Sequence, residues 1–485
     1  MNEQAWSLIK SCRKFYVAMI AGMFVSLLCS CAASRTESRD TFTLHADSLR
    51  RTSQGTFEAW GNVSIETTDF ILYAPGFVYT PTNARVVFDG PVEIVITNRS
   101  HRENLEFLKN GMSCPVLLPD VSFDEATLPA DSMEGTLSAF LGGPKLDIQQ
   151  VHTGDRFPNT VVALDGTVLA LFGGVKVRRS EDGGVTWGPE ILVGKGFMGG
   201  GAIVNESNGD ILAFVEEHHP PAPLTVYRSE DNGKTWAVMD VVIKPDNKGN
   251  VPSMHMNEAG ITLRHGKHAG RIIRPARYYA AGNRSEEWSN HYTTAIYSDD
   301  AGKTWNTSEP FPAFGMGEAT MAELADGRIY YNSRRHWAPE GINPRRRWTA
   351  WSDDGGESWK GLAICEALPD GPQNSNYGCM GGLVRLPVAG KDILLYSNCD
   401  SPDGRNRGTV WASFDGGKTW PVKRLVYEGG FAYSSLSAGR PGTKSEGWIY
   451  LQFESGGAKM ARFNLSWVLE GEKTGDGEVP AWVKR

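Results

Sequence analysis

The chain has 485 residues, 40% of them hydrophobic and 22% charged, which is enough to form one large β domain or two to three smaller domains. Its net charge of −7 leaves no basic surplus, which argues against nucleic acid as a partner. Glycine (55 residues) and tryptophan (15 residues) are both abundant, as expected where short strands meet at tight turns, so the composition favours an all-β fold.

The N-terminus has the pattern of an export signal. Basic residues within positions 10–14 precede an apolar run from 15 to 31, which is short for a membrane-spanning helix. The run ends in Leu28-Cys-Ser-Cys31, which resembles a bacterial lipobox, so we expect Cys31 to carry a lipid anchor. Residues 1–31 are then a lipoprotein signal peptide, and the mature protein lies in the cell envelope, at the outer membrane, facing the periplasm or the surface. A plain signal peptide cleaved nearby is the alternative, and it also takes the protein out of the cytoplasm.

The remaining cysteines are too few and too scattered for a disulfide framework. A bridge between Cys379 and Cys399 stays open as an alternative. No CxxC pair and no HExxH spacing is present, so the sequence predicts neither a metal site nor a cofactor.

Residues 32–145 predict a small β-rich accessory domain. Alternating segments at 57–67 and 85–97 are separated by glycine and proline, as in strands joined by turns. The pattern indicates no particular role for this domain.

A motif of the form SxDxGxTW recurs five times in the following part of the chain. The copies are Ser180–Trp187, Ser229–Trp236, Ser298–Trp305, Ser352–Trp359 and Ser413–Trp420. A fixed motif repeated every 50–70 residues is typical of a propeller or a solenoid.

Each copy of this Asp-box motif reads as a hairpin turn. The aspartate accepts turn amides, the glycine adopts a backbone conformation that other residues resist, and the tryptophan packs between sheets. We therefore expect structural roles for Asp182, Asp231, Asp300, Asp354 and Asp415. If each box joins the third and fourth strands of a blade, functional residues should lie on the opposite rim.

Four stretches outside the boxes carry charged or aromatic residues that fall on this predicted rim. Arg156 stands in the first stretch, between Asp155 and Phe-Pro-Asn. Glu318 and Arg334 stand at the two ends of one predicted hairpin. Arg405 precedes the last box, and Tyr433 lies in the segment Phe-Ala-Tyr-Ser-Ser-Leu.

In content and order these stretches resemble the motifs of the bacterial sialidase (neuraminidase) family. The resemblance implies a six-bladed sialidase propeller over residues 150–470, followed by a tail at 471–485. It also implies that Arg156, Arg334 and Arg405 bind a substrate carboxylate, that Tyr433 is the nucleophile and that Glu318 takes its proton.

The chemistry explains why such residues would be gathered. Arginine binds a carboxylate through two parallel hydrogen bonds and stays charged. A carboxylate nucleophile would be repelled by the acid group of a sialic acid, whereas a tyrosine attacks as a nearly neutral phenol. Because the tyrosine pKa lies near about 10, Tyr433 needs a neighbouring base.

The sequence departs from the family at the general acid. The family places an aspartate between the second and third strands of the first blade, but residues 169–179 contain no carboxylate. The matching loop of the second blade contains Glu217 and His218, and either one is a candidate donor of the missing proton. The alternative is an ordinary solvated loop. If the residue positions a water instead, the reaction inverts configuration.

Further polar residues fall on the same rim. Residues 254–258, 290–291 and 345–347 are either substrate contacts or ordinary loop residues, and Glu454 is expected to steer an arginine rather than react.

The leading hypothesis is an exo-acting glycoside hydrolase that removes terminal sialic acid, or a related nonulosonic acid, from glycoconjugates outside the cell. The alternative is a non-hydrolytic, lectin-like propeller that binds sugar acids, since the loss of the usual acid would remove turnover and leave the arginines. Sialylated glycans are the expected partners in both cases.

Overall fold

The computed structural model describes six strands within residues 43–96 and the stretch 133–483, except for positions 155, 174, 256–257, 338–344 and 371–377. The chain divides into two compact units, residues 1–128 and 129–485. The signal segment and Cys31 lie outside the described residues. Within the described residues, no helix is both long enough and apolar enough to cross a bilayer.

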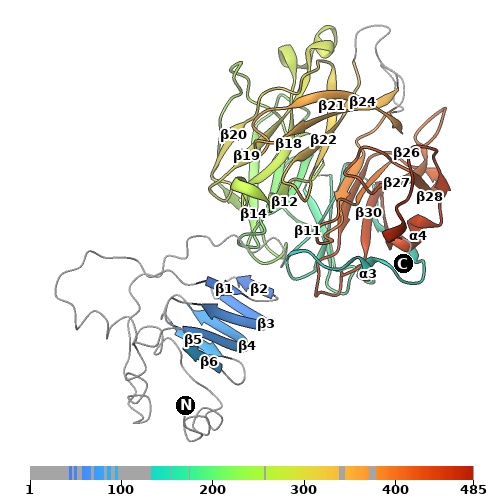
Figure 1. Cartoon of the computed structure of the whole chain (residues 1–485). Coiled ribbons are helices and arrows are strands. Elements are labelled where there is room, and N and C mark those ends of the chain that lie inside the picture. The colour runs from blue at the N-terminus through green and yellow to red at the C-terminus, as the bar shows by residue number, and fades with distance from the viewer. Residues whose placement is uncertain are drawn as a thin grey trace, which may run out of the picture. The chain divides into compact units, whose positions relative to one another are not determined.

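The first unit contains one antiparallel sheet, as predicted for the accessory domain (Figure 1). Its strands are β1 (Thr43–His45), β2 (Ser48–Arg51), β3 (Phe57–Glu66), β4 (Phe70–Thr80), β5 (Arg85–Phe88) and β6 (Glu93–Ile96). The long β3–β4 hairpin forms the centre, with β1 and β2 paired to β3 and β5 and β6 paired to β4. The two segments predicted as strands therefore form β3, β5 and β6.

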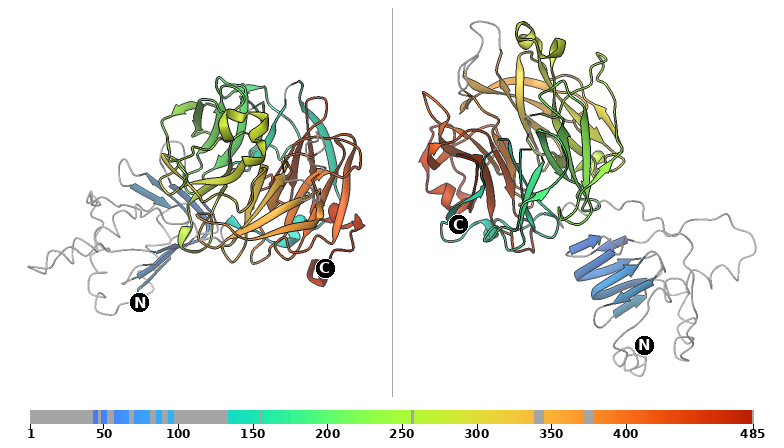
Figure 2. Two further views of the ribbon diagram at one scale, coloured as in Figure 1. Left: turned by 90° about the horizontal axis from the view of Figure 1, so that it is seen from above. Right: turned by 180° about the vertical axis from the view of Figure 1, so that it is seen from behind.

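The second unit consists of six sheets, each with four antiparallel strands, which confirms the six-bladed propeller (Figures 1 and 2). Blade 1 contains β8 (Pro158–Val162), β9 (Val168–Phe172), β10 (Lys176–Ser180) and β11 (Ile191–Leu192). Blade 2 contains β12 (Met198–Val204), β13 (Ile211–Glu216), β14 (Leu224–Ser229) and β15 (Ala237–Met239). Blade 3 contains β17 (Ile261–Thr262), β18 (Ile272–Tyr278), β19 (Tyr292–Ser298) and β20 (Thr304–Thr307), extended by β16 (Val242–Ile243).

Blade 4 contains β21 (Met316–Glu323), β22 (Ile329–Arg335), β23 (Arg346–Ser352) and β24 (Lys360–Pro369). Blade 5 contains β25 (Gly382–Arg385), β26 (Leu394–Cys399), β27 (Asn406–Ser413) and β28 (Val422–Gly430), extended by β32 (Glu472–Lys473). Blade 6 contains β29 (Ser434–Ala438), β30 (Ile449–Glu454), β31 (Ala458–Phe463) and β7 (Leu146–His152). The first strand of each blade contacts that of the next, from β8 through β12, β17, β21, β25 and β29 back to β8. The ring is closed by β7, which precedes the other propeller strands in the chain but pairs with β31, the last strand of the sixth blade in chain order.

The five boxes join the third and fourth strands of blades 1 to 5, as predicted. In the first box, Asp182 accepts hydrogen bonds from the amides of Val185 (3.0 Å) and Thr186 (2.9 Å) and from the hydroxyl of Ser180 (2.8 Å). The structural role expected for the box aspartates is confirmed by these contacts. In the third box, Gly302 has φ +88°, and a Cβ there would lie 2.4 Å from Leu212 of the neighbouring blade, so only glycine fits.

The box tryptophans pack between blades. Trp305 of blade 3 is fully buried and lies edge-on to Phe214 of blade 2, with ring centroids 5.4 Å apart. Trp420 of blade 5 belongs to a core cluster that includes Tyr330 of blade 4. Each such indole buries a large apolar area between two sheets and thereby fixes one blade against the next.

The propeller unit extends past both predicted boundaries. Before β7, helix α3 (Leu137–Phe140) buries Phe140, and the amide of Gly135 donates to the Pro387 carbonyl at 2.8 Å. After β31, helix α4 (Leu465–Leu469) leads to β32, which pairs with β28 of blade 5. The segment expected as a tail therefore contributes a strand to blade 5. The remaining short helices are the 3-10 turns η4 (Gly266–His268), η5 (Ala280–Asn283), η6 (Ser285–Asn290) and η7 (Ala481–Val483).

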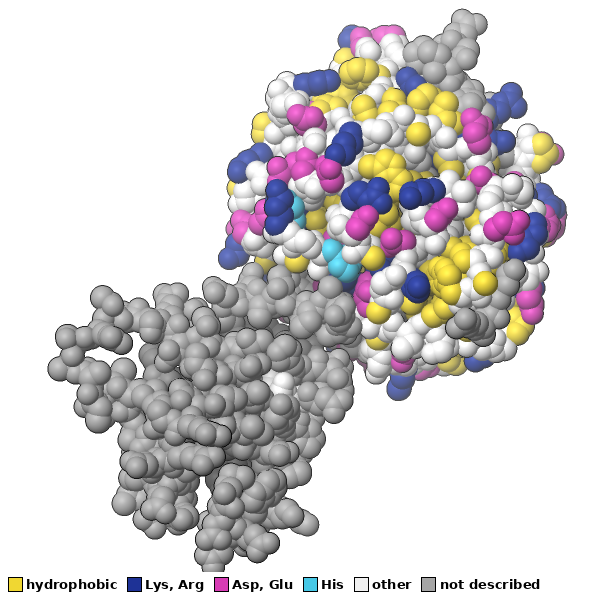
Figure 3. All heavy atoms as spheres, viewed as in Figure 1, with side chains coloured by type: hydrophobic (Ala, Val, Ile, Leu, Met, Phe, Trp, Pro, Cys, Tyr) yellow, Lys and Arg dark blue, Asp and Glu magenta, His cyan; other side chains and the backbone are white. Residues whose placement is uncertain are grey.

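Acidic and basic side chains are interspersed over the face of the propeller seen in Figure 3. Inside the propeller, Cys379 and Cys399 are both buried, with their sulfur atoms 3.6 Å apart.

Candidate active site

The five residues predicted to form the site all lie on the rim opposite the boxes. Arg156 and Tyr433 stand just before the innermost strands β8 and β29, and Glu318 lies near the start of the innermost strand β21. Arg334 lies near the end of β22, and Arg405 directly precedes β27. Because antiparallel strands alternate in direction, each of these positions falls on the same rim.

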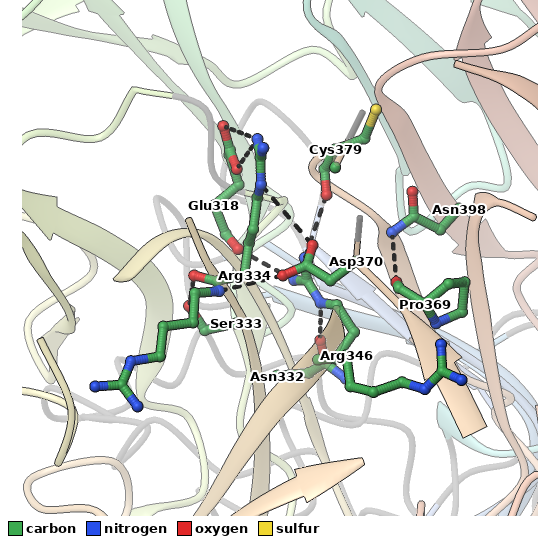
Figure 4. Close-up of polar contacts among 12 residues, drawn as sticks. Glu318, Asn332, Ser333, Arg334, Arg346, Pro369, Asp370, Cys379 and Asn398 are labelled. Carbon is green, nitrogen blue, oxygen red and sulfur yellow. Dashed lines mark hydrogen bonds and ion pairs between the residues drawn. The ribbon is translucent and has the colours of Figure 1, made fainter. Parts of the chain in front are cut away.

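Tyr433 and Glu318 form a buried hydrogen-bonded pair. The tyrosine hydroxyl donates to Glu318 Oε1 at 3.2 Å, and Arg334 Nη1 lies 3.1 Å from Glu318 Oε2. Arg334 Nε is also 3.8 Å from Oδ1 of Asp370, so its guanidinium lies between two carboxylates (Figure 4). The geometry places an acceptor for the phenolic proton directly beside Tyr433.

The electrostatics of this pair keep the carboxylate charged and the phenol neutral. Burial raises the pKa of Glu318, but Arg334, His336 and Arg277 together outweigh it and hold the pKa well below its usual range. Burial and the charge of Glu318 raise the pKa of Tyr433 well above its ordinary value, against Arg405 and Arg334. A free phenolate is therefore strongly disfavoured at Tyr433, and the charged Glu318 is placed to accept the phenolic proton.

Arg156 and Arg405 both lie over the aromatic ring of Tyr433. The guanidinium carbon of each is 5.0 Å from the ring centroid. Arg156 Nη2 is held by Glu454 Oε2 at 3.3 Å, and the other oxygen of Glu454 accepts from the amide of Phe157 at 2.8 Å, so Glu454 steers an arginine as expected. Arg405 Nη2 donates to the carbonyl of Gly378 at 3.0 Å. The Nε atom of Arg405 is buried and has no partner among the described residues.

Asp370 and Arg347 are buried beneath the site and support it, and no sequence motif pointed to Asp370. Arg347 is fully buried and donates to Asp370 Oδ1 at 3.1 Å, to the Glu318 carbonyl at 3.1 Å and to Asn332 Oδ1 at 2.7 Å. Burial raises the pKa of Asp370 to about 7, against the two arginines. Of the basic run 345–347, Arg347 is therefore a buried support rather than a rim residue, while the side chain of Arg346 extends away from this network (Figure 4).

Glu217 and His218, the two candidate acids, are both exposed. His218 Nδ1 lies 3.0 Å from the carbonyl of His219. In the described part of the chain, no contact links either side chain to Tyr433, Glu318 or the three arginines. The loop between β9 and β10 consists of Gly-Gly-Val, so this loop of the first blade supplies no carboxylic acid.

His219, the next residue of this loop, belongs instead to a group of rings beside the site. Its ring centroid lies 5.0 Å from that of His255 and 5.6 Å from that of Tyr279. His255 in turn lies 5.3 Å from Phe157, whose ring is 5.9 Å from Tyr433. Among the residues described, no three His, Cys, Asp or Glu side chains are grouped as ligands of a metal ion.

Comparison with known proteins agrees with this architecture. Residues 173–444, more than half of the chain, match the family described as "BNR repeat-like domain", and the chain belongs to that family. Its sequence relatives are sialidases. One from Micromonospora viridifaciens is 32% identical over 354 residues, covering 64% of this chain and 52% of the relative. One from Bacteroides fragilis is 26% identical over 346 residues, covering 59% of each.

The chain spans between 52% and 59% of the length of these two relatives. A solved structure of "Hadza microbial sialidase Hz136" is similar in fold, with a TM-score of 0.51 and 23% identity over 64% of this chain and 66% of that one.

Proposed function

We propose that this protein is an exo-acting glycoside hydrolase that removes terminal sialic acid, or a related nonulosonic acid, from glycoconjugates. The observation that carries the proposal is the buried Tyr433–Glu318 hydrogen bond with Arg156 and Arg405 over the tyrosine ring and Arg334 on the glutamate. Neither a purely structural propeller nor a neutral-sugar site needs three arginines around a tyrosine. The sialidase relatives support the same substrate class.

In this proposal the arginines hold the substrate carboxylate and thereby place the anomeric carbon next to Tyr433. Arg405 and Arg156 are the best placed of the three, because neither guanidinium is saturated by carboxylates on all sides. Tyr433 attacks the anomeric carbon while its proton moves to Glu318, and the arginines stabilise the developing negative charge on the phenolic oxygen. Attack by Tyr433 followed by water retains configuration, whereas direct attack by water inverts it.

Proton NMR of the purified protein with sialyllactose tests the proposal, because it shows both the release of free sialic acid and its first-formed anomer. We expect release, with the α-anomer first. A wild-type protein that releases no sialic acid but binds sialyllactose, with binding lost in Arg405→Met, would contradict hydrolysis. That result would support the lectin-like alternative. The alternative is favoured by the absence of a carboxylic acid from the loop between β9 and β10.

Arg405→Met is preferred for this test because it leaves no buried carboxylate without a partner. The matched control is Arg407→Met, two residues away, whose side chain is 44% exposed and pairs with Glu428 on the surface. Release and binding are expected to be unchanged in this control.

We also propose that the protein is an exported lipoprotein anchored through Cys31. Expression of the full chain in a bacterial host with labelled palmitate tests this. Cys31→Ser should abolish the label, whereas Cys29→Ser, two residues earlier, should retain it. Label that persists in Cys31→Ser would contradict the anchor without affecting the proposed activity.

A further inference from the structure

The proposed reaction needs a second proton that the Tyr433–Glu318 pair does not supply. A sugar alkoxide is a poor leaving group, so the glycosidic oxygen has to be protonated as its bond breaks. Among the described residues, the three carboxylates that contact arginines of the site or their supports are already engaged. Glu318 is held by Arg334, Glu454 by Arg156 and Asp370 by Arg347.

A continuous row of rings leads from Tyr433 to the second blade. Phe157 lies 5.9 Å from Tyr433, His255 lies 5.3 Å from Phe157, and His219 lies 5.0 Å from His255. Arg156, which also lies over the ring of Phe157, connects this row to the arginines of the site. A sugar held by those arginines is therefore flanked by this row.

His219 is the accessible titratable group in the row. His255 is fully buried, so its imidazole cannot touch a bound glycan, whereas His219 is exposed on the rim. Its ring is fixed against Tyr279, which is itself buried and accepts a hydrogen bond from Arg277 Nη1 at 3.2 Å. The loop that carries His219 thus turns one histidine toward the site and leaves Glu217 and His218 in solvent.

The contacts of His219 leave its Nε2 atom available for proton exchange. Nδ1 lies 3.1 Å from the carbonyl of Pro220, which can only accept, and no described residue contacts Nε2. When Nδ1 keeps its proton and donates it in a hydrogen bond to this carbonyl, Nε2 can lose and regain a proton without any rotation of the ring. The side-chain nitrogen of Asn283, 3.2 Å from Nδ1, favours the other neutral tautomer and competes for the same atom.

We propose that His219 is the general acid of this hydrolase. This inference rests on the proposed function. As the bond between the anomeric carbon and the leaving oxygen breaks, its electron pair goes to that oxygen, which takes the Nε2 proton of the His219 imidazolium. At the same time Tyr433 bonds to the anomeric carbon and its proton passes to Glu318. In the second half, neutral Nε2 takes a proton from the attacking water, the bond to Tyr433 breaks, and Tyr433 regains its proton from Glu318.

The surroundings of His219 make the activity sensitive to pH. Burial lowers the pKa of His219 below its usual 6.5, as do Arg277 from β18 and the neighbouring His218, while the Pro220 carbonyl raises it. Other titratable groups around the ring include His255, Tyr279 and His291, which interacts with His219 electrostatically. Because a general acid acts in its protonated form, kcat/KM for a sugar leaving group should fall as the pH rises through this lowered pKa.

Two substrates that differ in the leaving group test the proposal with the full chain. Sialyllactose needs a protonated leaving oxygen, whereas an aryl sialoside releases a phenolate without it. For His219→Asn we expect kcat/KM to fall at least about 100-fold on sialyllactose and less than about tenfold on the aryl sialoside. His268→Asn, in the turn η4 beside Gly355 of the fourth box, is the matched control on the opposite side of the propeller, and it should leave both values unchanged. The fall of kcat/KM with rising pH should be present for sialyllactose and absent for the aryl sialoside.

Equal losses on both substrates in His219→Asn, or full activity on sialyllactose, would overturn the role of His219. If instead His336→Asn lowered kcat/KM on sialyllactose but not on the aryl sialoside, His336, the histidine near Glu318, would be the general acid in place of His219. A wild-type protein that cleaves neither substrate would overturn the proposed function itself, and with it this inference.

Discussion

Arg347 donates a hydrogen bond to the backbone carbonyl of Glu318, so a fully buried guanidinium holds the strand that carries the proposed base. The same guanidinium contacts Asp370, which also faces Arg334. Breaking a buried ion pair by removing one partner typically costs about 3–5 kcal/mol, because the other charge stays buried.

Arg347→Met should therefore lower the free energy of unfolding by about 3–5 kcal/mol, measured by urea denaturation. Arg346→Met is the control, because Arg346 is 40% exposed and its ion pair with the exposed Glu366 is 3.9 Å long, so a change below about 1 kcal/mol is expected. Similar values for the two variants would contradict the supporting role of Arg347.

Tyr433→Phe should retain the fold and the binding of sialyllactose but lose hydrolysis. The variant loses the hydrogen bond from the hydroxyl to Glu318, and it keeps the ring that Arg156 and Arg405 cover. Loss of the nucleophile should lower kcat by about 1,000-fold or more, followed by release of free sialic acid. Full activity in this variant, or β-anomer released first by the wild type, would remove Tyr433 from its proposed role.

Glu454→Gln should weaken substrate binding more than turnover. The amide can still accept from Phe157, but it loses the charge that holds Arg156. Loss of an ion pair of this partly exposed kind is worth about 1 kcal/mol, so KM for sialyllactose should rise about fivefold while kcat changes little. Glu428→Gln, which removes a surface partner of Arg407, is the control. A fall in kcat with KM unchanged would show that Glu454 does more than position Arg156.

Glu258 should make the propeller less stable at alkaline pH. Ser435 donates to this carboxyl at 2.5 Å, and burial raises its pKa to about 8 from the ordinary 4.5. Between these values the folded state keeps a proton that the unfolded chain has lost, so the stabilisation present below pH 4.5 disappears as the pH rises through 8. Glu216, whose pKa burial raises to about 7, acts with the same sign.

The thermal midpoint should thus fall between pH 5 and pH 9, and Glu258→Gln should show a smaller fall because its amide stays neutral. The exposed Glu478→Gln should behave as the wild type. An equal fall in all three proteins would contradict this assignment.

Asp231→Ala should cost stability without changing the chemistry. Asp231 accepts from the amides of Lys234 (3.0 Å) and Thr235 (2.9 Å) and from the hydroxyl of Ser229 (2.8 Å) in the second box. Its loss should lower the free energy of unfolding by about 1–3 kcal/mol, measured by denaturant titration. Because the box lies at the end of the blade opposite the site, kcat/KM below the unfolding temperature should be unchanged.

The features that the sequence predicted are those with a local signal. The boxes are complete within eight residues, so their turns and their place between third and fourth strands could be predicted. The rim positions of Arg156, Glu318, Arg334, Arg405 and Tyr433 followed from that blade scheme. The structure then adds their contacts, which no spacing in the sequence specifies.

What the sequence did not reveal depends on how irregular segments turn. In the loop 217–223 three successive titratable residues look alike, and only the backbone path shows that His219 faces the ring of His255. Asp370 belongs to no motif, because it reaches Arg334 from the end of a different strand, β24. The two-residue strand β32 is polar and has no periodicity, so the segment 471–485 reads as a tail.

The pairing of β7 with β31 also constrains when the propeller can form during synthesis. Of the four strands of the sixth blade, the outer strand β7 leaves the ribosome first and its partner β31 leaves it last. Until Phe463 has emerged, β7 remains an unpaired edge and the ring stays open. Closure is therefore a late and long-range event, with the loop-closure cost that such contacts carry, and a chain that stops short of β31 cannot complete the circle.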